Sequence, residues 1–158
     1  MDIRPATPAD VPVVVKMVRK LCELHQAWDP ARYAFRENIE QMYRSWLTDR
    51  AADPRAVFLV ADRQERGPVA FLIGTVEREI RIYKLEEFGF LHDLWVEEDY
   101  RNEGLGRQLV MRAIERFEEI GVKQVRLDTA AANEAARKLF ASCGFRATVI
   151  EMLKENGQ

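Results

Sequence analysis

The sequence lacks several features that mark specialised classes of protein. Its 158 residues include two cysteines, and neither Cys22 nor Cys143 stands in a CxxC or Cys/His spacing. This arrangement predicts two reduced thiols that behave as small apolar side chains, and it provides no pattern for a metal site. The formal net charge of -2 supplies no broad cationic field, so we expect no nucleic-acid partner.

Long apolar runs are missing as well. No uninterrupted apolar segment approaches the roughly 20 residues that a helix needs to span a bilayer, and residues 1–5 lack the apolar stretch of a signal peptide. We therefore expect a cytoplasmic protein with no membrane partner. There is no internal repeat, low-complexity tract or linker, and 47% of the residues are apolar while 32% are charged. Such a composition is typical of one globular domain, here covering residues 1–158.

Helical and extended patterns alternate along the chain. Apolar residues at helical spacing predict helices over about 7–25, 39–47, 105–120 and 133–143. Extended patterns predict strands at 2–5, 56–61, 69–76, 88–96, 122–129 and 145–153, with 77–84 able to extend the third. A polar turn over 64–68 would join the second and third strands into a hairpin. Thr7 suits the N-cap of the first helix, and Gly121 and Gly144 suit helix ends. The order implies a mixed α/β sheet with helices on its faces.

Two polar residues interrupt the strand predicted over 88–96. His92 and Asp93 stand side by side in an otherwise apolar run. Because adjacent strand residues point to opposite faces, at most one of them should face a cleft, unless a β-bulge intervenes.

The most informative run extends from Val96 to Arg107, between a strand and a helix. Gly104 and Gly106 stand at the helix start, where backbone N–H groups are free and the helix dipole adds partial positive charge. These features favour a phosphate or pyrophosphate site. The signal alone is weak, because glycine pairs before helices are often only turns. The run matches neither the dinucleotide nor the Walker fingerprint.

The run does match another pattern. Arg101-x-x-Gly104-x-Gly106 resembles the R-x-x-G-x-G/A acyl-CoA motif of the GNAT superfamily of N-acetyltransferases. Downstream, a block from Asn133 through Leu139-Phe140 to Gly144-Phe145 resembles the second characteristic block of that family. The clear resemblance covers about 88–145. It implies a mixed, mostly antiparallel central sheet flanked by about four helices, with splayed fourth and fifth strands. It is compatible with a homodimer, which no pattern establishes.

The resemblance also implies functional roles. Acetyl-CoA would be the acetyl donor. Backbone N–H groups of residues 101–107 would hold its pyrophosphate, Leu94 and Val96 would pair with the pantetheine arm through their backbone, and Asn133 would bind the arm or the phosphates. The residues expected to bind the donor are therefore Leu94, Val96, Arg101, Asn102, Glu103, Gly104, Leu105, Gly106, Arg107 and Asn133. The simpler interpretation of Asn133 is an N-cap for its helix.

Asp93 is the candidate general base, because family members often carry an acid shortly before the position of Val96, and burial would raise its pKa. The alternative is a structural Asp that pairs with a neighbouring cation or caps a loop, and His92 is a second candidate base. The chain departs from the family at Phe140, where many relatives have a tyrosine that can protonate the departing thiolate. Tyr100 and Tyr83 are candidate substitutes. Cys143 has no basic partner in the sequence, so we expect direct attack rather than a covalent route.

The acceptor is expected to be the primary amine of a small molecule. The segment between the first two helices has aromatic residues, and acids surround the fourth strand: Glu86, Glu87, Asp93, Glu97, Glu98 and Asp99. An acidic cleft would favour a polyamine, an aminoglycoside-like compound or a peptide amine, whereas the alternative is a solvated acidic surface. A protein or peptide N-acetyltransferase and a non-catalytic acyl-CoA-binding domain remain the competing functions.

Overall fold

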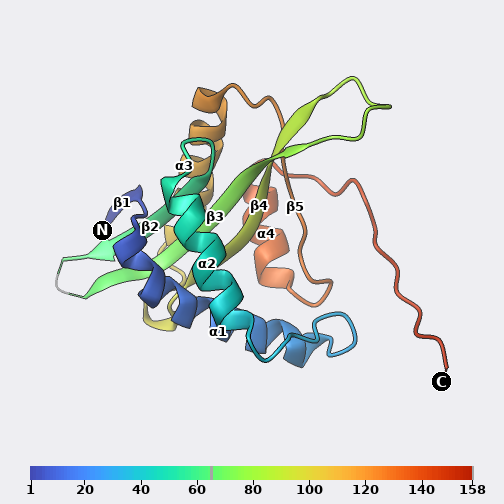
Figure 1. The fold of residues 1–158 in the computed structure, drawn as a ribbon, viewed down its shortest axis with the longest axis horizontal. Coiled ribbons are helices and arrows are strands. Elements are labelled where there is room, and N and C mark those ends of the chain that lie inside the picture. Colours follow the sequence, from blue (N-terminus) through green and yellow to red (C-terminus); the bar gives the residue numbers. More distant parts are fainter. Residues whose placement is uncertain (65, 158) are drawn as a thin grey trace.

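A central β-sheet separates two layers of helices (Figure 1). The computed structural model describes residues 1–64 and 66–157. Within them the strands are β1 (Asp2–Pro5), β2 (Val57–Arg63), β3 (Gly67–Arg78), β4 (Glu87–Val96) and β5 (Val125–Leu127). The α-helices are α1 (Val11–Trp28), α2 (Ile39–Ala52), α3 (Leu105–Ile120) and α4 (Glu134–Ser142), and short 3-10 helices cover Pro8–Asp10 and Glu98–Tyr100.

The strands lie in the order β1-β2-β3-β4-β5. The pairs β1–β2, β2–β3 and β3–β4 are antiparallel, and the pair β4–β5 is parallel. The β4–β5 pairing runs only from Gly89 to Leu91, so within the described part of the chain the rest of β4 has no partner on that side. The mixed, mostly antiparallel sheet with a splayed fourth and fifth strand is therefore confirmed.

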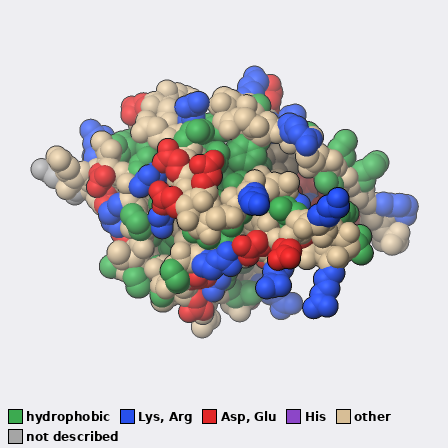
Figure 2. All heavy atoms as spheres, turned by 90° about the horizontal axis from the view of Figure 1, so that it is seen from above, with side chains coloured by type: hydrophobic (Ala, Val, Ile, Leu, Met, Phe, Trp, Pro, Cys, Tyr) green, Lys and Arg blue, Asp and Glu red, His purple; other side chains and the backbone are tan. Residues whose placement is uncertain are grey.

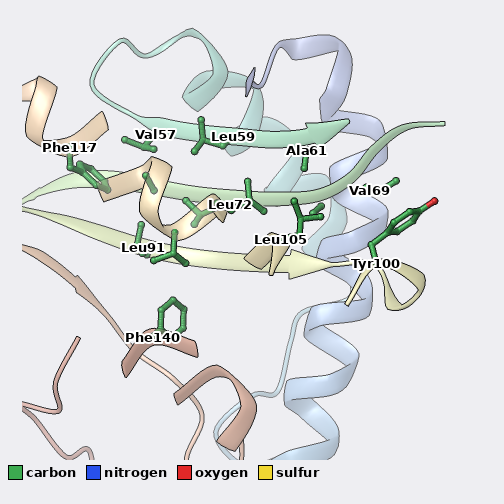
Figure 3. Packing of buried hydrophobic residues seen from close by; sticks show 14 of the residues in the cluster. Val57, Leu59, Ala61, Val69, Leu72, Leu91, Tyr100, Leu105, Phe117 and Phe140 are labelled. Carbon is green, nitrogen blue, oxygen red and sulfur yellow. The ribbon is translucent and has the colours of Figure 1, made fainter. Parts of the chain in front are cut away.

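Each face of the sheet buries its own apolar cluster. Helices α1 and α2 cover one face, where Val14 and Leu47 pack against Phe71 of β3. Helices α3 and α4 cover the other, where Phe117 and Phe140 join the inward residues of β2, β3 and β4 (Figure 3). Apolar residues three and four positions apart give each helix one apolar face, which buries itself against the sheet. Acidic and basic side chains are interspersed on the surface seen in Figure 2.

The chain start is held by a partly buried ion pair between Arg4 and Asp10. Arg4 contacts Asp10 through two hydrogen bonds of 2.8 and 2.9 Å, and Thr7 donates to the same carboxylate from its N–H and its hydroxyl. These donors lower the pKa of Asp10 to about 2, with the Arg4 hydrogen bond as the largest cause. The predicted first helix therefore begins as a 3-10 turn, and α1 continues beyond His25 to Trp28.

Two predicted strands differ from the structure. The strand predicted over 122–129 is confined to Val125–Leu127, and the strand predicted over 145–153 is wrong, since residues 145–157 form no strand. Val149 and Ile150 are 84% and 85% exposed. Their β-branched pattern favours extended backbone, but a strand also needs a neighbouring edge to pair with. The β2–β3 hairpin is confirmed, although its predicted turn includes residue 65, which lies outside the described residues.

Among the residues that the structure describes, no helix combines the length and apolarity that crossing a bilayer requires.

Candidate active site

A β-bulge in β4 brings His92 and Asp93 to the same face of the sheet. Ile73 lies opposite Asp93 and the next residue, Gly74, lies opposite Leu91, so His92 is the extra residue. A bulge shifts the alternation of side chains by one position. Both side chains consequently line one cavity. The sequence predicted that only one of them would face a cleft unless a β-bulge intervened, and the bulge is present.

This cavity, which we call the β4 cavity, lies between α1, α2 and β4 and has a volume of about 630 Å³. Its lining consists of Leu21, Cys22, His25, Arg32, Tyr33, Phe35, Ile39, Met42, Tyr43, Trp46, Phe90, Leu91, His92, Asp93, Asp128 and Ala130. In Figure 2 a histidine side chain is visible within a recess, and both histidines of the chain belong to this lining. The volume lies in the range of small-molecule sites.

Asp93, the candidate base, is a buried carboxylate in the lining of the β4 cavity. Burial raises the pKa of its carboxyl group to about 6, which places it near neutrality. Two weaker influences oppose the shift, a hydrogen bond from Tyr43 and the nearby charge of His25. The Tyr43 hydroxyl donates to Asp93 Oδ2 at 3.1 Å. Burial and the Asp93 charge raise the pKa of Tyr43, so this phenol keeps its proton at neutral pH.

Sequence reasoning missed Tyr43. The residue was assigned only to the apolar side of the second helix, and its contact with Asp93 joins residues 50 positions apart. Its neighbour Trp46, at 5.8 Å between ring centroids, belongs to the same aromatic wall.

His92 is held by its surroundings in one orientation. Its ring lies between Trp46 and Phe90, at centroid distances of 5.1 and 5.0 Å. Nε2 lies 2.6 Å from Thr75 Oγ1, and the Thr75 hydroxyl donates its one proton to Glu77 at 2.7 Å. Nε2 is therefore the donor toward Thr75. Burial lowers the pKa of His92, so the ring is mainly neutral near pH 7.

The loop before α3 presents a row of backbone N–H groups. Asn102 and Gly104 have φ of 64° and 78°, in the left-handed region, and Gln108 is the first residue of the helix whose N–H reaches an upstream carbonyl, that of Gly104. Across residues 1–64 and 66–157, the N–H groups of residues 102–107 donate to no protein acceptor, whereas that of Arg101 donates to Glu98. Six adjacent free donors at the start of a 16-residue helix are suited to binding an anion.

The unpaired edge of β4 adds further backbone groups. The N–H of Glu97 donates to Val69 on β3, and because backbone groups alternate along a strand, those of Leu94 and Val96 point the other way, into the gap beside β5. Arg101 lies at the end of this edge. Its Nε donates to the Val96 carbonyl at 2.9 Å and its guanidinium covers the Trp95 ring at 4.7 Å.

The model of the acetyltransferase (GNAT) family matches residues 18–145. This chain belongs to the GNAT family. Its members are N-acetyltransferases that use acetyl-CoA as the acetyl donor, and the chain is accordingly an acetyl-CoA-dependent acyltransferase.

Several acetyltransferases resemble this chain in sequence or in fold. An uncharacterized N-acetyltransferase of Archaeoglobus fulgidus is 25% identical over 146 residues, or 92% of this chain and 93% of that one. A ribosomal protein bS18-alanine N-acetyltransferase of Escherichia coli is 38% identical over 60 residues, or 38% of this chain and 40% of that one. A tetramutant of the BH1408 protein from Bacillus halodurans superposes with a TM-score of 0.83, at 22% identity and with 98% and 99% of the two chains covered. An aminoglycoside 6'-N-acetyltransferase from Acinetobacter haemolyticus superposes with a TM-score of 0.72, at 19% identity and with 99% and 100% covered. The two structures show the shared fold.

The remaining GNAT positions are placed as follows. The Asn133 side chain accepts the N–H of Ala136 at 3.1 Å, so its N-cap role is confirmed. Phe140 points from α4 toward the sheet and belongs to the buried cluster (Figure 3). Tyr100 is buried with its hydroxyl directed away from that cluster, Tyr83 is 57% exposed, and neither lines the β4 cavity. The cavity-lining cysteine is Cys22, whose burial raises its thiol pKa to about 11.

Of the two interpretations of the acids around the fourth strand, a cleft or a solvated surface, the structure favours the surface. Of the six acids around the fourth strand, all of which the structure describes, only Asp93 lines the β4 cavity. Glu87 instead lies 2.7 Å from Arg55, and Glu97 lies 2.8 Å from Lys20. These acids belong to the solvated surface that was the alternative.

Proposed function

We propose that this protein transfers an acetyl group from acetyl-CoA to the primary amine of a small molecule by direct attack, with both substrates bound. One observation carries the proposal: the β4 bulge places Asp93 in the β4 cavity, while the next residues, Leu94 and Val96, turn their backbone toward the gap beside β5. A single strand segment thus separates a cavity for the amine from a cleft for the donor. Holding two reactants in place accounts for much of the rate in such reactions.

The free backbone donors fit the acetyl donor. Its pyrophosphate would lie at the N–H groups of residues 102–107, and its pantetheine arm would pair with Leu94 and Val96. Gly104 supports the loop because its φ of 78° favours glycine. The missing Cβ of Gly106 faces Leu139, at 3.3 Å from its Cδ2, so this glycine lets α3 approach α4 rather than making room for the donor.

Asp93 is the proposed base. Acetyl-CoA supplies the thioester carbon at which the amine nitrogen forms its new bond while the carbon–sulfur bond breaks. Asp93 accepts the proton that the nitrogen loses, and the N–H groups of Leu94 and Val96 are available to the acyl oxygen as it gains charge. Cys22 does not compete as a nucleophile, because a thiol with a pKa of about 11 carries almost no thiolate at neutral pH.

Tyr43 is the proposed proton donor to the departing sulfur. Phe140 has no hydroxyl and lies in the core, whereas Tyr43 lines the β4 cavity and already donates to Asp93. If Tyr43 gives its proton to the thiolate, Asp93 can return to it the proton taken from the amine. The two groups then finish the cycle in their starting states.

The test is thiol release from acetyl-CoA with a panel of primary amines, repeated with Asp93→Asn. We expect turnover on one amine class and a loss of about 100-fold or more in kcat for the variant, since general bases contribute roughly 100-fold to 10,000-fold. Asp49→Asn, an exposed change on α2 outside the cavity lining, is the matched control and should retain full activity. Unchanged rates in Asp93→Asn would refute the assignment of the base.

A second candidate is acetylation of a peptide N-terminus. It is supported by the 38% identity over 60 residues to the enzyme named for the alanine of ribosomal protein bS18. Short peptides that begin with alanine belong in the panel, and turnover of these alone would favour this function.

A further inference from the structure

The nitrogen of an alkyl amine carries one proton more than Asp93 can take. Alkyl amines have pKa values near that of lysine, about 10.4, so at neutral pH they enter a site as ammonium ions. Such a nitrogen must lose one proton before it can attack and a second one as the new bond forms. Asp93 takes the second proton under the proposed function, so the first needs another acceptor.

His92 is the other titratable side chain that β4 contributes to the β4 cavity. The Thr75 hydroxyl donates its one proton to the Glu77 carboxylate at 2.7 Å, so its oxygen accepts from His92 Nε2 at 2.6 Å. Nε2 of the neutral ring therefore carries the proton, and Nδ1 keeps a lone pair. Within residues 1–64 and 66–157, Nδ1 has no hydrogen-bond partner.

The contacts of this ring fix its orientation. Thr75 is only 6% exposed, and Glu77 lies two residues further along β3, on the same face of the sheet. The Glu77 carboxylate is 3.6 Å from Nε2, so it would stabilise a positive charge on the ring. Trp46 and Phe90 hold the ring from either neighbouring element, at centroid distances of 5.1 and 5.0 Å.

The ring has charged or titratable neighbours on several elements. Burial lowers its pKa most strongly, Glu77 on β3 raises the pKa, and Arg50 on α2 lowers it. Asp93 follows the ring on β4, and α1 contributes His25 and Cys22 to the same lining. The ring is consequently uncharged near neutral pH, which is the state that can accept a proton.

Resting on the proposed function, we propose that His92 accepts the first proton of the acceptor's ammonium group at Nδ1, with Thr75 and Glu77 as positioning residues for its ring. The N–H bond of the ammonium breaks, and its electron pair stays on the nitrogen that then attacks the thioester. The proton later leaves Nδ1 for solvent, because the His92 side chain is 28% exposed. Thr75 and Glu77 prevent the opposite tautomer, in which Nδ1 would already hold a proton.

The pH dependence of His92→Gln tests the catalytic role. Glutamine keeps an N–H for Thr75 but has no basic nitrogen. In the unmodified protein, kcat/KM for the best amine of the panel should level off above the pKa values of Asp93 and His92. In His92→Gln it should be about 100-fold lower at pH 7.5 and rise about tenfold per pH unit up to the pKa of the amine, because only the free amine then reacts. A profile parallel to that of the unmodified protein would overturn the inference and leave the proposed function intact.

Two amines of nearly equal size separate this role from a loss of packing. At pH 7.5 ethylamine is almost wholly an ammonium ion, whereas trifluoroethylamine is mainly the free amine, because its fluorine atoms withdraw electron density. His92→Gln should lower kcat about 100-fold for ethylamine and less than about threefold for trifluoroethylamine. Equal losses for the two amines would assign His92 to packing and overturn the inference.

The positioning residues have conservative variants that serve as controls. Thr75→Val and Glu77→Gln should each lower kcat for ethylamine about tenfold with little effect on trifluoroethylamine, and Thr75→Ser should retain activity because it keeps the hydroxyl. Glu86→Gln removes a charge at an exposed position outside the cavity lining and should leave kcat unchanged. Equal kcat values for Thr75→Val and Thr75→Ser would refute the positioning role.

Nitrogen NMR separates the inference from the proposed function, because it needs no acceptor. Long-range proton–nitrogen spectra of the free protein show which ring nitrogen of His92 carries the proton, with the signals assigned through their loss in His92→Gln. A proton on Nε2, with this preference lost in Thr75→Val, would support the inference, whereas a proton on Nδ1 would overturn it. If Nε2 carries the proton but no amine of the panel is acetylated, the proposed function is refuted while the held tautomer still stands.

Discussion

Removing the Tyr43 hydroxyl should raise the pKa of Asp93. In Tyr43→Phe the ring remains but the 3.1 Å hydrogen bond to Asp93 Oδ2 is lost. That bond favours the charged carboxylate, and it is the larger of the two influences that oppose the effect of burial on this pKa. Without it, ionisation of Asp93 costs more free energy, so the group holds its proton to a higher pH.

The size of the shift follows from the type of bond. Hydrogen bonds to charged groups contribute about 1.5–3 kcal/mol, and one pKa unit corresponds to about 1.4 kcal/mol. The cavity allows water to approach and replace part of the lost interaction, so we expect the lower end, about one unit. The pKa of Asp93 should then move from about 6 to about 7.

Carbon-detected NMR titration of the Asp93 carboxyl group measures this pKa in the free protein, with the signal assigned through its loss in Asp93→Asn. Tyr33→Phe, which removes another cavity-lining hydroxyl, should leave the Asp93 pKa unchanged. An unchanged or lower pKa in Tyr43→Phe would refute the account of the pair. If Tyr43 also protonates the thiolate, kcat of Tyr43→Phe should stay low even at pH values above the raised pKa of Asp93. If Tyr43 acts only through its effect on that pKa, kcat should recover to the unmodified protein's value at those pH values.

Three further predictions concern stability. At pH 7.5, Asp93→Asn should raise the free energy of unfolding by about 3 kcal/mol, because a carboxyl whose pKa rises from 3.8 to about 6 on folding destabilises the fold once it is ionised. Chemical denaturation should show this gain shrinking toward pH 4. Asp10→Asn should cost about 2–3 kcal/mol at pH 7 in urea unfolding, with Asp2→Asn nearly neutral. Because the pKa of Asp10 is lowered, its contribution to the free energy of unfolding is present above about pH 4 and is lost as the pH falls toward about 2. A stability deficit of Asp10→Asn that persists at about pH 2 would contradict this. Gly104→Ala should cost about 1 kcal/mol and raise the KM for acetyl-CoA, whereas Asn102→Gly should be neutral in thermal unfolding.

Local patterns were sufficient for much of the fold. The helices were found from apolar spacing, because an amphipathic helix is specified by residues three and four apart. The glycine loop was found for a similar reason, since Gly104 and the helix start that follows it are adjacent in sequence. The strand predicted over 145–153 failed because pairing depends on a neighbouring edge, which no local pattern contains.

The same distinction between local and long-range interactions applies to the candidate site. The sequence by itself determined the family, and it predicted the loop before α3 as the donor site and Asp93 as candidate base, because these signals lie in short motifs. The tertiary structure alone decided that β4 bulges at His92, that Tyr43 reaches Asp93, and that the other acids predicted around the fourth strand lie outside the cavity. The position of the bulge depends on the register between β4 and β3. The contact between Tyr43 and Asp93 depends on how α2 packs across the sheet. Both arise from interactions between residues far apart in the chain, which no local spacing encodes.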